Sequence, residues 1–198
     1  MSWPPLNCIL DRNEYYAVGF SSYRAWSWLR LPVRTRTSPT YRSLAVWYQV
    51  VATYDGVTRR HYVNASPDGS WTENAPLELY NSMRIVIGAN ANDTDTSFAS
   101  PSGFVMCYIP IVRIYSRALS AEEVSQNYVN SLSPVRNGLV LWLQAHPDNV
   151  KDVDGDGVLE WVDLSGYGNH GKIYGATLVE VVKSPARVLS PARVVPTV

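Results

Sequence analysis

Residues 102–128 read SGFVMCYIPIVRIYSRALSAEEVSQNY and carry the clearest secondary-structure signal in the chain. Residues 104–115 are rich in β-branched and aromatic side chains, which favours a buried strand. Ser120 is followed three residues later by Glu123, the spacing of a capping box, in which each side chain accepts a hydrogen bond from the other residue's backbone N–H. Apolar residues recur after this cap at helical spacing, at Ala121, Val124 and Tyr128. The segment therefore predicts a strand followed directly by a short amphipathic helix.

The residues before this segment read as short strands separated by polar turns. Trp26 and Trp28 share one face of an expected strand, where they either stack on a sugar ring or pack in the core. The polar loop 90–102 is either a recognition loop or a spacer. Its candidate ligand-binding residues are Asn90, Asn92, Asp93 and Asp95. The expected strands are 8–10, 15–20, 25–33, 44–54, 60–64 and 84–89, with a loop at 34–43.

Two of these stretches resemble laminin-G-like members of the concanavalin A-like lectin and glucanase superfamily. VRIYSRALSAEE at residues 112–123 is similar to the end of the last long strand in that family. WYQVVATYDG at 47–56, with HYVN at 61–64, resembles a family hairpin, although Ala65 replaces the usual turn glycine. The resemblance implies an all-β fold: a concanavalin A-like jelly-roll sandwich of two antiparallel sheets with one short helix.

Two later stretches resemble the beginning of the same kind of domain, so the family segments stand in permuted order. They are GLVLWL at 138–143 and DLSGYGNHGKIYGA at 163–176. Either residues 138–176 fold back into their own sandwich, or they begin or complete a neighbouring one by strand addition. We expect self-completion, which gives a single domain over residues 1–178 and an extended tail at 179–198.

Residues 152–163 read DVDGDGVLEWVD, which has the spacing of a calcium-binding loop: carboxylates at loop positions one, three, five and twelve, with glycine at six. Carboxylates this close together repel one another unless a cation is bound. The alternative is a solvated acidic turn, in which Asp163 serves only the turn. The expected calcium ligands are Asp152, Asp154, Asp156, the backbone carbonyl of Val158, Glu160 through a water molecule, and Asp163.

The composition of the chain limits the classes of function that we expect. A chain of 198 residues with 46% hydrophobic residues has the size and apolar content of one β-rich domain with a real core. A formal net charge of zero argues against a nucleic-acid partner, and no apolar run is long enough for membrane insertion. The carboxylate phrase of glycosidase relatives is absent, so we expect no enzyme. Cys8 and Cys107 form either one disulfide or none.

Two functions remain in competition. One is a non-catalytic structural subunit of a virion or extracellular filament, which assembles with copies of itself through strand or tail exchange. This interpretation explains both the permuted strands and the lack of a recognisable signal peptide, and it predicts an extracellular or virion-surface location. The alternative is a recognition module of the lectin type, which binds a cell-surface glycan or protein. Calcium is the expected cofactor in both.

Overall fold

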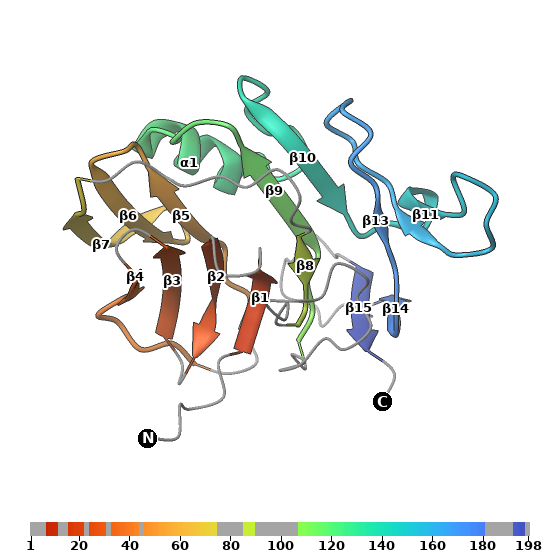
Figure 1. Cartoon of the computed structure of the whole chain (residues 1–198), viewed down its shortest axis with the longest axis horizontal. Coiled ribbons are helices and arrows are strands. Elements are labelled where there is room, and N and C mark those ends of the chain that lie inside the picture. Colours follow the sequence, from red (N-terminus) through yellow and green to blue (C-terminus); the bar gives the residue numbers. More distant parts are fainter. Residues whose placement is uncertain are drawn as a thin grey trace. The chain divides into compact units, whose positions relative to one another are not determined.

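The structure is a computed structural model (Figure 1). It describes residues 7–11, 16–21, 24–30, 33–43, 46–74, 85–89, 107–180 and 192–196. The chain divides into two compact units, each with its own sheets. The first is Met1–Val105 with Arg117–Val135, and the second is Met106–Ser116 with Arg136–Val198.

The first unit contains a five-stranded antiparallel sheet with the strand order β4-β3-β2-β1-β8. Its neighbouring strands β1 to β4 follow one another in the chain, so each pair is a simple hairpin or meander connection. The strands are β1 (Asn7–Asp11), β2 (Tyr16–Ser21), β3 (Arg24–Arg30), β4 (Val33–Thr37) and β8 (Val86–Ile87).

A second antiparallel sheet of the first unit has the order β5-β6-β7. The turn after β5 is held by Asp55, whose carboxylate accepts from the N–H groups of Val57 and Thr58 at 3.0 and 2.6 Å. The next turn has positive φ angles of 50° at Asn64 and 63° at Ala65, a conformation that glycine adopts with less strain. The strands are β5 (Val50–Tyr54), β6 (Thr58–Val63) and β7 (Ser66–Thr72).

The two sheets of the first unit meet through polar side chains. A hydrogen bond joins Ser27 Oγ on β3 to His61 Nε2 on β6, and both residues are 2% exposed. Arg59 Nη1, also on β6, donates to the carbonyl of Ser27 at 3.1 Å. Tyr62 and Val63 are buried on the same strand. The first unit is therefore a sandwich whose two layers are linked by hydrogen bonds between β3 and β6.

The helix α1 (Ala121–Val129) confirms the predicted capping box: Glu123 N donates to Ser120 Oγ at 3.2 Å, and Ser120 N donates to the Glu123 carboxylate at 2.9 Å. The predicted apolar face is only partly correct. Val124 is fully buried, but Tyr128 is 45% exposed. The second buried position is Asn127, because its side-chain oxygen accepts from Val135 N at 2.8 Å and so holds the chain that follows the helix.

In the second unit, β9 (Ile111–Tyr115) pairs antiparallel with β10 (Leu139–Gln144). Leu143 is 1% exposed and lies opposite the buried Val112, so this pair carries much of the apolar core of the unit. The 3₁₀ turn η1 (Pro147–Asn149) leads into a small sheet of the order β11-β12-β13. The remaining strands are β11 (Val150–Lys151), β12 (Glu160–Trp161), β13 (Gly171–Lys172), β14 (Ala176–Glu180) and β15 (Ala192–Pro196), the last two paired antiparallel.

The predicted β-rich class with one α-helix is confirmed, with several changes of element bounds. The expected strand 25–33 is divided between β3 and β4, and β4 occupies part of the expected loop 34–43. The extended part of residues 107–115 begins at Ile111, because Pro110 has no N–H to give to a ladder. The single domain over 1–178, the completion of a sandwich by 138–176 and the tail at 179–198 stay predictions. No helix in the described parts of the chain has the length and apolar character needed to cross a membrane.

Candidate functional site

The acidic loop, residues 152–157, lies in the connection between β11 and β12 of the second unit. Gly155 and Gly157 have φ angles of 78° and 85°, a region that other residues enter only with strain. A side chain at either position would meet no atom within 4 Å, so backbone conformation rather than lack of space requires glycine there. The two glycines let the loop curl tightly enough to bring its aspartates together.

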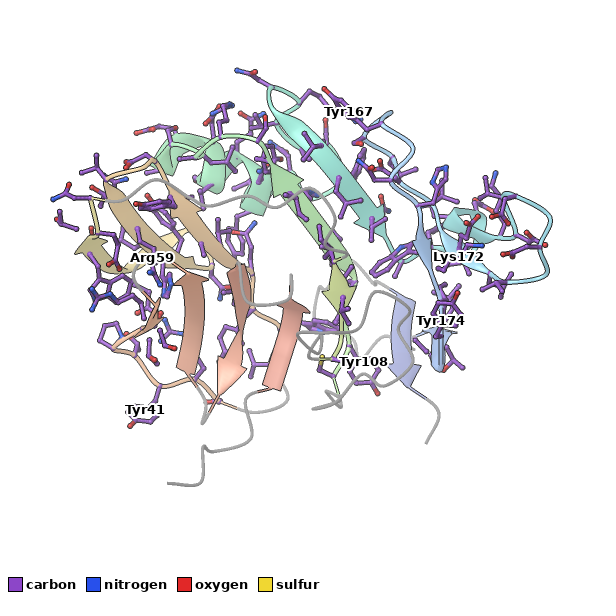
Figure 2. All side chains as sticks on the ribbon, viewed as in Figure 1. Tyr41, Arg59, Tyr108, Tyr167, Lys172 and Tyr174 are labelled. Carbon is purple, nitrogen blue, oxygen red and sulfur yellow. The ribbon has the colours of Figure 1, made fainter. Side chains whose placement is uncertain are left out.

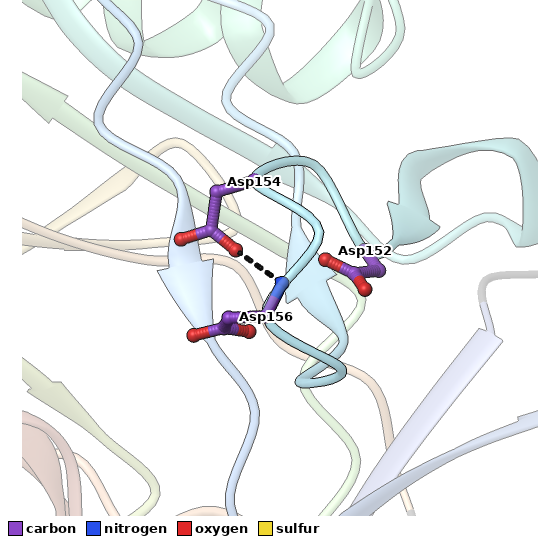
Figure 3. Close-up of side chains that lie close together, drawn as sticks. All are labelled: Asp152, Asp154 and Asp156. Atoms are coloured by element: carbon purple, nitrogen blue, oxygen red, sulfur yellow. Dashed lines mark hydrogen bonds between the residues drawn. The ribbon is translucent and has the colours of Figure 1, made fainter.

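Asp152, Asp154 and Asp156 converge in this loop (Figure 3). One carboxylate oxygen from each lies within 4.8 Å of the others, and all three residues are exposed. Asp152 accepts from the N–H groups of Gly155 and Gly157 at 2.7 and 2.9 Å. Asp154 accepts from Asp156 N at 3.2 Å, and Asp156 accepts from Val158 N at 2.9 Å. The backbone of the loop thus orients all three carboxylates, which form a set of hard oxygen donors.

Lys172 on β13 provides the positive charge at this loop. Its Nζ donates to Asp154 Oδ2 at 3.0 Å and also to Asp156 Oδ2. The hydrogen bonds from Lys172 and from Val158 N lower the pKa of Asp156, and the two aspartates raise the pKa of Lys172. The ammonium group therefore holds two of the three carboxylates on one side of the loop.

Two further predicted calcium ligands, Glu160 and Asp163, have other partners in the structure, and the role of the Val158 carbonyl stays a prediction. Glu160 is 5% exposed and accepts from Val153 N at 3.0 Å, so it braces the base of the loop. Asp163 is 6% exposed, and its carboxylate accepts from Trp142 N, from Ser165 and from Asn169 N. Burial would raise the pKa of Asp163, but these hydrogen bonds outweigh burial, and the pKa lies below its ordinary value. Asp163 thus ties a turn to β10.

In the first unit, the segment 38–43 presents an exposed aromatic ring on an anchored loop (Figure 2). Ser38 Oγ bonds His61 Nδ1 at 3.2 Å. The buried carboxylate of Asp68 accepts from Thr40 Oγ1 at 2.6 Å and from Arg42 Nη2 at 2.9 Å. Tyr41 lies between these anchors and is 68% exposed. Sequence analysis missed this feature, because residues 34–43 read only as a polar loop.

The other predicted ligand-binding positions are not tested by the structure. Trp26 and Trp28 lie on β3, opposite Thr37 and Thr35 of β4, and only their backbone is described. Asn90, Asn92, Asp93 and Asp95 lie outside the described residues. Cys107 is a free cysteine, and burial raises the pKa of its thiol to about 11, so it carries no reactive thiolate at neutral pH.

The layered antiparallel sheets of the first unit have the architecture of a β-sandwich module. A laminin-G-type family model, described as the concanavalin A-like lectin/glucanases superfamily, matches residues 8–125, which is more than half of the chain. The chain belongs to this superfamily, and the predicted family resemblance is confirmed. The match does not extend over residues 138–176, so the permuted order of segments stays a prediction.

One solved structure supports the same fold, and a second match is weaker. A proposed carbohydrate-binding protein from Bacteroides ovatus ATCC 8483 superposes with a TM-score of 0.65 at 17% sequence identity. The match covers 84% of this chain but only 47% of that protein, so this chain spans about half of its length. An S-layer domain-containing protein (residues 221–444) from Clostridium thermocellum ATCC 27405 is 23% identical over 59% of this chain and 57% of that one, with a TM-score of 0.34. No curated protein matches the chain.

Proposed function

We propose that this chain is a non-catalytic recognition module of the lectin type, which binds a glycan and is supported by calcium. The observation that carries the proposal is membership of the concanavalin A-like lectin/glucanases superfamily, joined to the fold shared with the Bacteroides ovatus protein. These findings favour recognition over the virion or filament interpretation.

The anchored Tyr41 supports the proposal on physical grounds. A tyrosine ring offers a flat apolar face for the C–H groups of a sugar and a hydroxyl that can hydrogen-bond. Its loop is tied to β6 and β7 through Ser38, Thr40 and Arg42, so little conformational freedom remains to be lost when a ligand binds. Tyr41 is therefore a candidate stacking residue on a loop that is held in place before the sugar arrives.

Calcium is proposed for the acidic loop as a structural ion. The three converging carboxylates of Asp152, Asp154 and Asp156 are the hard oxygen donors that Ca²⁺ prefers. Glu160 and Asp163 are occupied elsewhere, so the chain supplies fewer carboxylates than a high-affinity loop does. We expect weak binding, on the order of the 10⁻⁴–10⁻³ M typical of extracellular modules.

A glycan array probed with the labelled chain, once with Ca²⁺ and once with chelator, tests the proposed function. We expect binding to a restricted set of glycans, and Tyr41→Ala should weaken the strongest of them by about threefold to tenfold, as loss of one aromatic contact predicts. Tyr128→Ala is the matched control, because Tyr128 is also an exposed ring of the first unit. Silence across the array under both conditions would overturn the proposal.

A further inference from the structure

Arg113, Arg136 and Trp142 of the second unit form a group that we name the Arg–Trp cluster. Arg113 on β9 lies directly opposite Trp142 on β10 in the antiparallel register, so their side chains share one face of the sheet. Arg136 precedes β10 in the chain. The guanidinium carbons of Arg136 and Arg113 lie 4.5 and 5.8 Å from the centroid of the Trp142 ring. Two cationic groups therefore meet on one indole.

All three side chains are hydrogen-bond donors. Guanidinium groups carry N–H donors and no acceptor, and an indole carries one N–H donor. Trp142 is 6% exposed, and its Nε1 has no hydrogen-bond partner among the described residues. Buried donors in folded proteins nearly always have an acceptor, so this orphaned indole N–H needs an acceptor that the described residues do not supply.

Electrostatics indicates that this acceptor is negatively charged. Burial lowers the pKa of Arg113, Tyr115 raises it, and the charge of Arg136 lowers it. The two guanidinium groups therefore repel each other where they meet on the Trp142 ring. A bound anion would relieve that repulsion. Arg136 is exposed at the surface, which gives a ligand access to the cluster.

Stacking also prepares Arg136 for recognition. Its guanidinium carbon lies over the Trp142 ring, and Nη1 donates to the Leu164 carbonyl at 3.2 Å, so two contacts restrict its orientation. A stacked guanidinium keeps N–H groups along its edge, whose fork geometry matches the two oxygens of a carboxylate. Lysine has the same charge but lacks this planar fork.

We propose that the Arg–Trp cluster binds a carboxylate, and that the glycan recognised by this chain is an acidic one that contains uronic acid residues. The inference rests on the proposed glycan-binding function and deepens it by naming the ligand class. In this proposal Arg136 is the exposed contact, Trp142 is the platform and indole donor, and Arg113 is the second positive charge of the cluster.

Isothermal titration of the full chain with oligogalacturonate, and with its methyl ester as a neutral ligand of the same sugar skeleton, tests the inference. We expect the free acid to bind and the ester to bind about tenfold to a hundredfold more weakly, the range for loss of a charge-assisted hydrogen bond. Arg136→Gln should weaken the acid to a similar degree, and Arg136→Lys should lie between this variant and the unmodified chain. Arg60→Gln is the matched control, because it removes an arginine from β6 that lies outside the cluster and is 40% exposed.

The possible outcomes separate this inference from the proposed function. Equal affinity for acid and ester, or equal weakening by Arg136→Gln and Arg60→Gln, would overturn the carboxylate site while leaving glycan recognition in place. Failure of every glycan on the array would overturn both. Thermal unfolding of Arg136→Gln provides the structural check: a lowered midpoint with unchanged acid affinity means that the arginine only covers the indole, which contradicts the inference.

Discussion

One charged group in the first unit and one in the second are arranged in opposite ways. In the first unit, Glu73 is enclosed between Arg36 and Arg59, and the side chains of Glu73 and Arg59 are only 2% and 1% exposed. In the second unit, Asp154 and Asp156 share Lys172 in an exposed loop, with side chains 50% and 42% exposed. Charges out of water need fixed partners of opposite sign, whereas charges in water can exchange theirs.

The two regions are therefore expected to have different roles. The buried group includes His61 between Ser27 and Ser38 and links strands of both sheets, so changes there should alter folding stability. The acidic loop is held by short-range turns and one exchangeable lysine, so changes there should alter ion binding more than stability.

The largest expected effect is that of Glu73→Gln. This substitution leaves the buried Arg59 without its carboxylate, and breaking a buried ion pair in this way costs about 3–5 kcal/mol of folding stability. Urea unfolding of the variant and the unmodified chain measures the difference.

The matched control for Glu73→Gln is Arg60→Gln, which breaks the exposed pair between Arg60 and Asp55. Exposed pairs contribute about 0–1 kcal/mol, so this variant should unfold close to the unmodified chain. If both variants lose the same stability, the contrast between buried and exposed charges is wrong for this chain.

The next effect concerns pH. Burial, assisted by the charge of Arg59, lowers the pKa of His61 to about 4. In the unfolded chain the pKa returns to about 6.5, so the unfolded state binds more protons between these two values. Folding stability should therefore be fully present above about pH 6.5 and fall as the pH drops towards 4, by about 3 kcal/mol in all.

Urea unfolding at a series of pH values checks this expectation, with His61→Gln as the comparison. The free energy of unfolding of the variant should no longer fall between pH 6.5 and 4. The loss of stability that sets in at lower pH should remain. The groups responsible for that loss include Asp55 and Glu123, whose pKa values are lowered to about 2 by hydrogen bonds. An unchanged slope in the variant would assign the pH dependence to other groups.

The sequence predicted those features that depend on neighbouring residues. The capping box joins Ser120 and Glu123, and the turn at Asp55 closes on residues two and three positions later, so both are visible as short phrases. The convergence of the acidic loop was also predictable, because the spacing of Asp152, Asp154 and Asp156 sets it.

Features that depend on strand register or on distant partners could not be predicted. Lys172 reaches Asp154 from 18 residues away, through the pairing of β12 with β13. The meeting of Arg113 with Trp142 requires the register between β9 and β10. Asp163 fits the twelfth position of a calcium loop by spacing, but its carboxylate is taken by the backbone of β10 and of its own turn. The spacing of residues in the sequence identifies a possible metal ligand, whereas tertiary contacts determine which groups its carboxylate contacts.

The smallest expected effect concerns the exposed charges of the acidic loop. If Lys172 occupies the place of a cation, Lys172→Gln should tighten Ca²⁺ binding several-fold, because the metal no longer has to displace an ammonium group from Asp154 and Asp156. Lys151→Gln is the charge-matched control, since Lys151 lies on β11 next to the same loop and has the same exposed character. Calorimetric titration with Ca²⁺ separates the two variants.

Two outcomes would contradict competition between Lys172 and the metal. Equal tightening of Ca²⁺ binding in both variants would mean that only the net charge near the loop matters. Loss of Ca²⁺ binding in Lys172→Gln would mean that the lysine organises the carboxylates rather than competing for them.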